Sequence, residues 1–476
     1  MKKILIIASF FLPAGLQAQP VHNYLEKIRN NAASLTAFFS QMPKGGDLHH
    51  HYSGSVYAET FFDIAVEKNF FINKTTLELR ETKPADDIAW TDLSSLEKEG
   101  LLPDYKQRLL QQWSAKDYNF ISYPSHRQFF ESFGHFGIAA DISFDRGLLE
   151  LKQRAKAEHV AYIETMFKTI DCDKSVVDLY TVNEKLEQFQ SLKNIISTNV
   201  LLDSLFTVIE KRNVTDCAIK FNEELSRLHT QLEIDDSEFM MRYQNFVLRF
   251  MNPAQLFTNL VVAFESANRS PLVVGVNIVA PEHDDVSMND YWLHMQMFAY
   301  CHKKFPQVKY SMHAGELALG LVKPEELSWH INAAVLDAKA NRIGHGVDLA
   351  YEKDCYALLN YMSRNKIPVE INLFSNEFIL KVKDDRHPIM LYRSFGVPVV
   401  ISSDDAGVLR TNLTDQYVLL AKRYPGISYE EIKTFVYNSI EYSFIEEPAT
   451  KQKLRLKLDT DFRIFENKIL TKVVNL

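Results

Sequence analysis

The sequence predicts an α/β protein whose eight parallel strands close into a (β/α)8 barrel, a TIM barrel, with a helical insertion after the first strand and extra helices. Three observations favour this fold. Past residue 250, continuous apolar runs alternate with helix-length amphipathic segments, which is typical of βαβ units in a parallel sheet. The strand-like runs number eight, which is the number that closes such a barrel. A chain of 476 residues accommodates one large barrel with insertions.

The first half of the chain supplies three of these strands. They are expected at 46–49, 159–165 and 204–209. The third run, SLFTVI, is compatible with a helix as well as with a strand. A further stretch, 215–266, has a helical pattern that is too long for one crossover.

The segment between the first two strands, 57–147, is far longer than one crossover helix. It contains a polar stretch at 75–87 and helix-like pieces at 104–113 and 126–137. This segment is therefore expected to form an insertion on the barrel, because surface insertions are the ones a barrel tolerates.

The second half of the chain alternates strands and helices more regularly. Strands are expected at 271–278, 308–312, 341–343, 367–373 and 398–401, and helices at 289–304, 324–339, 353–364 and 388–395. Pro306 and Gly396 follow two of these helices as stop signals, and Pro324 starts another. Ser428 and Glu431 form a capping-box pattern, which predicts a closing helix.

The composition excludes several classes of protein. The chain has 53 Lys+Arg against 61 Asp+Glu, a formal net charge of -8, and 46% hydrophobic residues. These values exclude a disordered or collagen-like chain. No segment is dense in Lys or Arg, so neither nucleic acid nor an anionic membrane is expected as the main partner. A small molecule is the expected partner, and the sequence predicts no particular oligomeric state.

The N-terminus has the layout of a secretory signal peptide. Lys2 and Lys3 precede an apolar run at 4–12, and small residues lead to a cut expected after Ala18. Residues 1–18 are therefore predicted to be removed, leaving 19–476 as a single secreted or periplasmic domain. The apolar run is too short to span a membrane. The alternative is a buried N-terminal helix or strand.

The chain contains four widely spaced cysteines, which are Cys172, Cys217, Cys301 and Cys355. They contain no C-x-x-C pair, so neither a thiol metal site nor a redox motif is indicated. They are compatible with buried thiols or with up to two disulfides, and the pairing stays open.

Metal-ligand residue types gather where the predicted strands end. Such residues follow strands one, five, six and eight at 47–51, 313–316, 344–346 and 402–405. Successive side chains of a strand point to opposite faces, so His49 and His51 share a face and His50 points away. In a (β/α)8 barrel these strand ends meet over one rim, where active sites lie.

Three histidines and one carboxylate of this set suit a zinc ion. His49, His51, His313 and Asp404 offer imidazole nitrogen and carboxylate oxygen, which Zn2+ prefers. An open position beside such an ion lowers the pKa of a bound water toward about 7. The four residues are predicted to form one metal site.

Five motifs, in this order, give the chain a family resemblance. MPKGGDLHHHYSGS, SMHAGE, RIGHG, VEINLFSN and HPIMLYRSFGVPVVISSDDAG resemble the motifs of the adenosine deaminase family, within the amidohydrolase superfamily. The FFESFGHFGI segment, the predicted signal peptide and NSIEYSF resemble the secreted branch called adenosine deaminase-related growth factors. The resemblance covers residues 42–444.

The resemblance implies a hydrolase that converts adenosine, or a closely related 6-aminopurine nucleoside, into an inosine-type product and ammonia. It assigns the metal to His49, His51, His313 and Asp404 as above. It also implies that Glu316 protonates the ring nitrogen beside the reacting carbon. His345 would orient the attacking water and carry its proton, and Asp405 would hydrogen-bond a purine nitrogen. A proton donor of this kind needs a raised pKa, which burial provides.

The resemblance also implies a single Zn2+ per chain. Superfamily members with two metals use a bridging group at the fourth strand, commonly a modified lysine, and no Lys lies between Ser270 and His302. The H-x-E and P-C-x-x-C motifs of the unrelated cytidine-type deaminases are absent.

Two positions depart from the family pattern on the expected substrate side. The family places an aspartate that contacts the ribose where this chain has Ser53. The backbone N–H that normally contacts the purine would come from Ala280, in the segment Asn277-Ile278-Val279-Ala280-Pro281-Glu282. These departures leave deamination of a different aminopurine open as an alternative. A catalytically inactive secreted binding or signalling protein on the same scaffold is a second alternative, against which the retention of every proposed catalytic residue counts.

Overall fold

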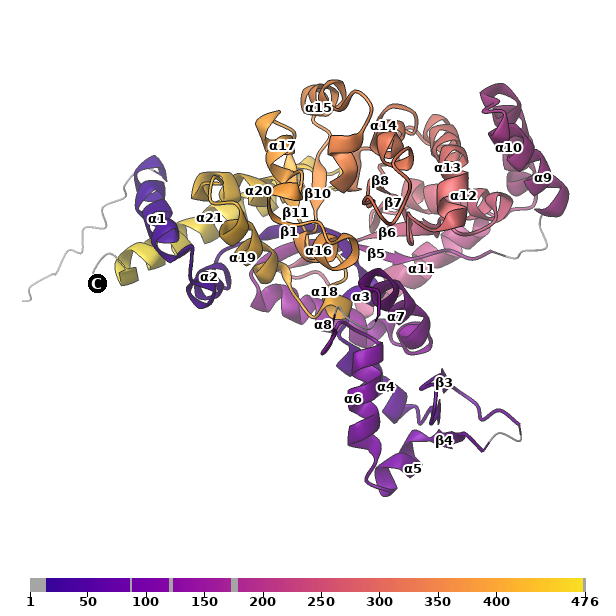
Figure 1. Ribbon diagram of the computed structural model, residues 1–476, viewed down its shortest axis with the longest axis horizontal. Helices are drawn as coiled ribbons and strands as arrows, with labels where there is room; N and C mark the ends of the chain where they lie inside the picture. The colour runs from indigo at the N-terminus through magenta and orange to yellow at the C-terminus, as the bar shows by residue number, and fades with distance from the viewer. Residues whose placement is uncertain (1–13, 86–87, 120–122, 173–178, 474–476) are drawn as a thin grey trace, which may run out of the picture.

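The computed structural model describes residues 14–85, 88–119, 123–172 and 179–473. Its centre is a ring of eight parallel strands in two four-stranded sheets (Figure 1). The first sheet has the order β1-β5-β6-β7 and the second has the order β11-β10-β9-β8. The strands are β1 (Gly45–His51), β5 (Val160–Lys168), β6 (Met240–Leu248), β7 (Val273–Val279), β8 (Ser311–Ala314), β9 (Arg342–His345), β10 (Val369–Ile371) and β11 (Val399–Ile401).

Backbone hydrogen bonds join the two sheets into a closed barrel. On one side, the N–H of Val276 in β7 donates to the carbonyl of Lys309, just before β8, at 3.1 Å. On the other side, the N–H of Asp404 donates to the carbonyl of His49 at 2.9 Å, and the N–H of His51 donates to the carbonyl of Asp404 at 3.3 Å. The predicted (β/α)8 fold is confirmed, and the second seam lies among predicted site residues.

The predicted third strand is wrong. SLFTVI lies in the helix α10 (Ile195–Lys211), whose buried residues Leu202, Leu205, Phe206 and Ile209 follow a helical spacing. The third strand is β6, which lies between α11 (Asp216–Gln231) and α12 (Pro253–Arg269) in the stretch that had a helical pattern. All other predicted strands overlap strands of the barrel.

The helices between the later strands agree with the predictions, with one exception. α13 (Asp285–Lys304), α15 (Cys355–Arg364) and α17 (Ile389–Ser394) lie where helices are expected. The helix expected at 324–339 is divided into the 3-10 turn η2 (Glu326–Ser328) and α14 (His330–Leu336). Trp329 separates them because its backbone, with φ at -154°, is not helical. Ser428 and Glu431 form the predicted capping box of α20 (Tyr429–Glu441).

The segment expected as an insertion forms several short elements. They are α3 (Tyr52–Ser55), α4 (Ala58–Glu67), β2 (Phe71–Asn73), β3 (Leu79–Arg80), β4 (Trp90–Asp92), α5 (Leu93–Lys98), α6 (Leu102–Gln112) and α7 (Ser125–Ala140). The antiparallel sheet β3-β2-β4 was not predicted. Part of the segment projects below the barrel in Figure 1, whereas α7 lies against it. α8 (Phe144–Ala157) packs on β5 and is therefore the crossover helix.

The remaining helices surround the barrel. They are α1 (Ala14–Ile28), α2 (Ala32–Phe39), α9 (Leu179–Ser191), η3 (Val347–Tyr351), α16 (Leu373–Leu380), η4 (Asp384–Arg386), α18 (Ala406–Leu409), α19 (Leu413–Arg423) and α21 (Pro448–Val473). Residues 1–13 of the predicted signal peptide lie outside the described residues, and α1 spans its expected cut after Ala18. Within the described part of the chain, no helix is long and apolar enough to cross a membrane.

The structure pairs two of the four cysteines. Cys172, which follows β5, forms a disulfide with Cys217 at the start of α11, and their Cα atoms are 6.1 Å apart. Cys301 is a buried thiol and Cys355 is a partly buried one.

A buried ion network crosses the interior of the barrel. Arg342 of β9 is 1% exposed. Its Nη2 lies 2.7 Å from Glu164 Oε2 of β5, and its Nε donates to Glu370 Oε1 of β10. The guanidinium also lies over the ring of Phe444, at 3.5 Å from the centroid. The network links the two sheets of the barrel, because β5 belongs to one sheet and β9 and β10 belong to the other.

We expect Arg342→Met to lower the free energy of unfolding by about 3–5 kcal/mol, because it leaves two carboxylates buried without their cation. Urea unfolding followed by circular dichroism measures the change. Arg364→Met, on the exposed face of α15, is the control and should change stability by less than about 0.5 kcal/mol. Equal stability of the two variants would contradict a structural role for the network.

Candidate active site

A cavity of about 440 Å³ opens at the carboxyl ends of the barrel strands. Its volume falls within the range of about 300–1,000 Å³ usual for small-molecule sites. All of the predicted site residues except His49 line it, namely His51, Ser53, Ala280, His313, Glu316, His345, Asp404 and Asp405. His49 is fully buried beneath them. The structure therefore brings the whole predicted set to one place.

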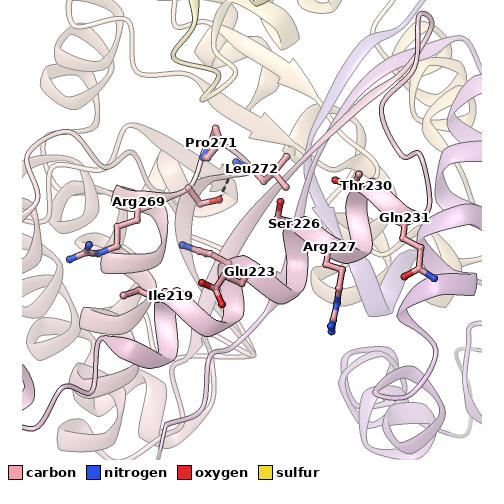
Figure 2. Close-up of a pocket in the computed structure, with 11 residues that line it drawn as sticks. Ile219, Glu223, Ser226, Arg227, Thr230, Gln231, Arg269, Pro271 and Leu272 are labelled. Carbon is pink, nitrogen blue, oxygen red and sulfur yellow. Dashed lines mark hydrogen bonds between the residues drawn. The ribbon is translucent and has the colours of Figure 1, made fainter.

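A larger groove of about 1000 Å³ lies elsewhere on the molecule, and Figure 2 shows its lining. Residues of α11 and the segment 269–272, which precedes β7, form its walls. The groove is thus at the amino end of that strand, opposite the predicted site. No histidine or cysteine occurs among the described residues that line it, so it offers no metal-ligand cluster.

Three histidines and Asp404 converge beneath the cavity. His51 Nε2 lies 3.1 Å from His313 Nε2 and 3.4 Å from Asp404 Oδ1, and His49 Nε2 lies 3.6 Å from the same oxygen. His49 Nε2 is buried and has no hydrogen-bond partner among the described residues. A buried nitrogen without a partner is costly unless something binds it. Nitrogens and a carboxylate oxygen at this spacing fit one divalent cation.

Neighbouring side chains orient two of these imidazoles. His49 Nδ1 lies 2.7 Å from Glu370 Oε2, and His313 Nδ1 lies 3.0 Å from Asn277 Oδ1. Each contact holds the Nδ1 proton and leaves Nε2 free to bind a cation, as partners of metal-binding histidines do. His50 points away from the cluster and bonds Thr165 Oγ1 at 3.0 Å, as strand alternation predicts.

Two of the three histidines are held in the neutral form that can bind a cation. Burial, together with the charge of His49, lowers the pKa of His51 and His313 well below the usual value. Burial disfavours the charged form of His49 as well, but the hydrogen bond to Glu370 and the charge of Asp404 raise its pKa overall. Neutral imidazoles are the form that binds metals.

Burial favours the protonated form of Glu316, which lies beside the cluster. Burial raises its pKa well above the usual value, and the charges of Asp404 and Glu282 add to this effect. Glu282 also fixes the turn that carries it, because its two carboxylate oxygens accept the N–H groups of Gly315 at 3.1 Å and Glu316 at 2.8 Å. A rigid, protonated carboxyl can donate a proton to a ligand in the cavity.

A chain of hydrogen bonds assigns the tautomer of His345. The N–H of Ile389 donates to His387 Nδ1 at 3.2 Å, so His387 Nε2 carries a proton and donates to Asn376 Oδ1 at 3.0 Å. The amide nitrogen of Asn376 then donates to His345 Nδ1 at 2.9 Å. His345 therefore carries its proton on Nε2, which lies 4.0 Å from Asp404 Oδ2.

The backbone bends sharply at three site residues. Ala280, His345 and Asp404 have φ angles of +84°, +68° and +61°. This region costs residues with a side chain about 1–2 kcal/mol each, and such strain is concentrated at functional sites. The seam hydrogen bonds with β1 hold Asp404 in this conformation.

Asp405 lies buried next to Asp404 and faces the cavity. Its Oδ1 has no hydrogen-bond partner among the described side chains and backbone groups. Gly54 makes room for it, because a Cβ at that position would overlap the Asp405 carboxylate. Ser53 and Ala280 line the same cavity.

Some residues of the site were not predicted to act there. Glu370 was quoted only within a motif, although a charged residue between Val369 and Ile371 in an apolar strand indicates a buried partner. The aromatic residues of α7 that line the cavity are Phe129, Phe130 and Phe133. No local pattern indicates that α7 reaches the site, because the position of this helix depends on how the insertion folds.

Comparison with protein families adds an independent observation. The family model described as adenosine deaminase matches residues 212–461. The chain belongs to the adenosine deaminase family. The predicted family is confirmed.

Curated relatives carry deaminase names. The chain is 34% identical over 128 residues to aminodeoxyfutalosine deaminase of Streptomyces coelicolor, a match that covers 27% of this chain and 32% of the relative. It is 25% identical over 449 residues to adenosine deaminase 2 of Dictyostelium discoideum, which covers 89% of this chain and 73% of that protein.

Solved structures share the fold. Adenine deaminase from Arthrobacter aurescens has a TM-score of 0.55 and 15% identity, with 88% of this chain and 98% of that chain covered. Arabidopsis ADAL complexed with IMP has a TM-score of 0.53 and 18% identity over 90% and 99%. An amidohydrolase from Burkholderia ambifaria with bound Zn has a TM-score of 0.52 and 15% identity over 92% and 95%.

We expect Asn277→Leu to weaken the binding of a divalent cation, with Zn2+ as the probe, about 10- to 100-fold, because it removes the acceptor that orients His313. Competition with a chromophoric chelator measures the dissociation constant. Asn259→Leu in α12 removes a buried amide of the same size outside the site, so it should leave zinc affinity unchanged. Unchanged zinc affinity in both variants would exclude the assigned role of Asn277.

Proposed function

We propose that the protein catalyses metal-dependent hydrolytic deamination of adenosine or of a closely related 6-aminopurine nucleoside. Water adds to the carbon that bears the amine, the carbon–nitrogen bond breaks, and an inosine-type product and ammonia leave. The grouping of His49, His51 and His313 carries this proposal, together with Asp404, whose Oδ1 lies 3.4 Å from His51 Nε2 and 3.6 Å from His49 Nε2, and with the buried Glu316, whose pKa is raised. Membership of the adenosine deaminase family supports it.

The same four residues are proposed to hold one Zn2+ per chain. The partnerless Nε2 of His49 and the orienting contacts of Glu370 and Asn277 support this assignment. A zinc ion bound there would lower the pKa of water so that a nucleophile exists at neutral pH.

The remaining site residues are proposed to move protons and to hold the purine. Glu316 donates its proton to the ring nitrogen beside the reacting carbon, which interrupts the aromaticity of the ring. His345, with its proton on Nε2, would orient the attacking water as a hydrogen-bond donor, and the neighbouring Asp404 carboxylate would accept the proton that the water loses. The free Oδ1 of Asp405 accepts or shares a hydrogen bond with another ring nitrogen.

A purine nucleoside other than adenosine is the second candidate substrate. Ser53 is a shorter and neutral partner where the family has an aspartate, and the relative from Streptomyces coelicolor is named for a different substrate. The inactive binding or signalling protein is disfavoured, because the structure retains every residue that the chemistry needs at the site.

Glu316→Gln should lower kcat about 10²- to 10⁴-fold, because glutamine keeps the shape of the side chain but has no acidic proton. In the unaltered protein, kcat/KM should fall as the pH rises through the raised pKa of Glu316, since only the protonated form donates. Absorbance and ammonia release measure turnover over a pH series.

The matched control is Glu352→Gln. Glu352 is a buried glutamate at the C-terminal end of η3, and it does not line the cavity. It should retain turnover. If zinc-loaded Glu316→Gln deaminated aminopurines at the unaltered rate, the proposed chemistry would be excluded.

We also propose that residues 1–18 direct export, so that the mature protein is secreted or periplasmic. The Cys172–Cys217 disulfide supports an oxidising compartment.

Expression of the full chain in a Gram-negative bacterium tests this export. Mass spectrometry of the periplasmic fraction should find a mature chain that begins at Gln19. Ile7→Arg, which interrupts the apolar run, should retain the uncut chain in the cytoplasm. An uncut chain in the cytoplasm without this substitution would contradict the prediction.

A further inference from the structure

Beyond the metal cluster, the wall of the cavity is apolar and largely aromatic. Helix α7 contributes three phenylalanines and the end of β6 contributes two more, with methionine, leucine, valine and proline between them. These residues are Phe129, Phe130, Phe133, Met166, Phe246, Leu248, Phe250, Val279 and Pro281. A wall of this composition contributes dispersion and apolar burial to a ligand but accepts no hydrogen bond from it.

The aromatic part of the wall is packed rather than loose. The ring of Phe129 contacts Phe130 edge-on at a centroid distance of 5.0 Å, and it contacts Phe133 at 5.7 Å. Phe133 in turn packs on Phe136, which stacks on Phe61 of α4 at 5.0 Å. The wall therefore has a fixed shape before a ligand enters, which lowers the entropic cost of binding.

The described lining of the cavity contains carboxyl groups but no lysine or arginine. Glu316, Asp404 and Asp405 line it, whereas no Lys or Arg occurs among its described lining residues. Arg249 is fully buried and does not line the cavity. Its Nη2 donates to the carbonyl of His313 at 2.8 Å, and its Nη1 lies 3.8 Å from Glu282 Oε2. A 5′-phosphate at the aromatic wall would find no Lys or Arg side chain to neutralise its charge.

Few polar groups are left for the sugar. Among the described residues that line the cavity, Ser53 has the sole uncharged hydroxyl or amide side chain. The histidines and carboxyls are assigned to the metal, the proton transfers and the purine. A 5′-hydroxyl that reached the aromatic wall would therefore lose its water without a hydrogen-bond partner, at a cost in affinity.

Space remains next to the wall. Gly134 of α7 lines the cavity, and a Cβ built there would meet no heavy atom within 4 Å. The helix thus faces the cavity with an open position between aromatic residues, into which an apolar group of a ligand can extend.

We propose that the cavity selects aminopurine nucleosides whose 5′ position carries an uncharged apolar group, such as an alkylthio group, and excludes nucleoside 5′-phosphates. This inference rests on the proposed deamination and names the substrate class of the same site.

Turnover of three nucleosides tests the proposal. The zinc-loaded full chain is assayed with 5′-deoxy-5′-methylthioadenosine, adenosine and adenosine 5′-monophosphate. We expect kcat/KM for the methylthio compound to exceed that for adenosine about tenfold or more, because one apolar group in such a pocket changes kcat/KM by about 10- to 200-fold. The monophosphate should be at least about 100-fold poorer than adenosine. Equal or better turnover of adenosine or of the monophosphate would overturn the proposal.

Binding of the deaminated products separates this inference from the proposed function. If none of the three compounds is turned over, the deaminase assignment fails, and calorimetry with 5′-methylthioinosine, inosine and inosine 5′-monophosphate still decides the selectivity. The methylthio compound should bind at least about tenfold more tightly than inosine, and the monophosphate should bind most weakly. Any other order would overturn the inference.

A pair of glycine variants on α7 locates the selectivity. Gly134→Leu places a side chain in the open position, so the ratio of kcat/KM for the methylthio compound to that for adenosine should fall about tenfold. Gly137→Leu is the matched control, because a Cβ there also meets nothing within 4 Å but does not line the cavity. That control should keep the ratio. An unchanged ratio in Gly134→Leu would exclude the proposed contact.

Discussion

The seam that closes the barrel is the constraint on which the rest of the site depends. Backbone hydrogen bonds connect Asp404 to His49 and His51, so the last strand can meet the first only with its carboxylate beside two imidazoles. The hydrogen bonds that close the sheet therefore also bring the side chains of His49, His51 and Asp404 together. The same two bonds hold the backbone of Asp404 in its positive-φ conformation. Closure of the barrel therefore positions three of the four predicted cation ligands next to one another.

Below the seam, a chain of buried charges connects the ligands to the interior. His49 contacts Glu370, Glu370 contacts Arg342, and Arg342 contacts Glu164 on the far sheet. Each charge is compensated by the next, so the network tolerates burial that would be costly for any single member. The result is an imidazole whose orientation is fixed by the barrel itself rather than by a surface loop.

The sequence predicted features that depend on local pattern and on barrel geometry. The ligand set follows from strand ends that must share a rim, which is why His49 and His313 could be associated although they are far apart in the chain. The third strand was wrongly placed at SLFTVI because this short apolar run is compatible with a helix as well as with a strand. Tertiary packing places it in α10. The contribution of Phe130 and Gly134 to the cavity could not be predicted, because no local sequence pattern specifies where an insertion packs on the barrel.

Helix α7 has a further consequence for how this protein can change. It belongs to the segment between the first two strands and not to the barrel repeat, yet it forms one wall of the reaction chamber. The residues of the predicted cation site and the aromatic residues of α7 thus lie in different segments of the chain, although β5 and β6 also contribute Met166 and Phe246 to the wall. Substitutions on the side of α7 that faces the cavity could therefore change which ligands bind, while the residues at the strand ends stay unaltered.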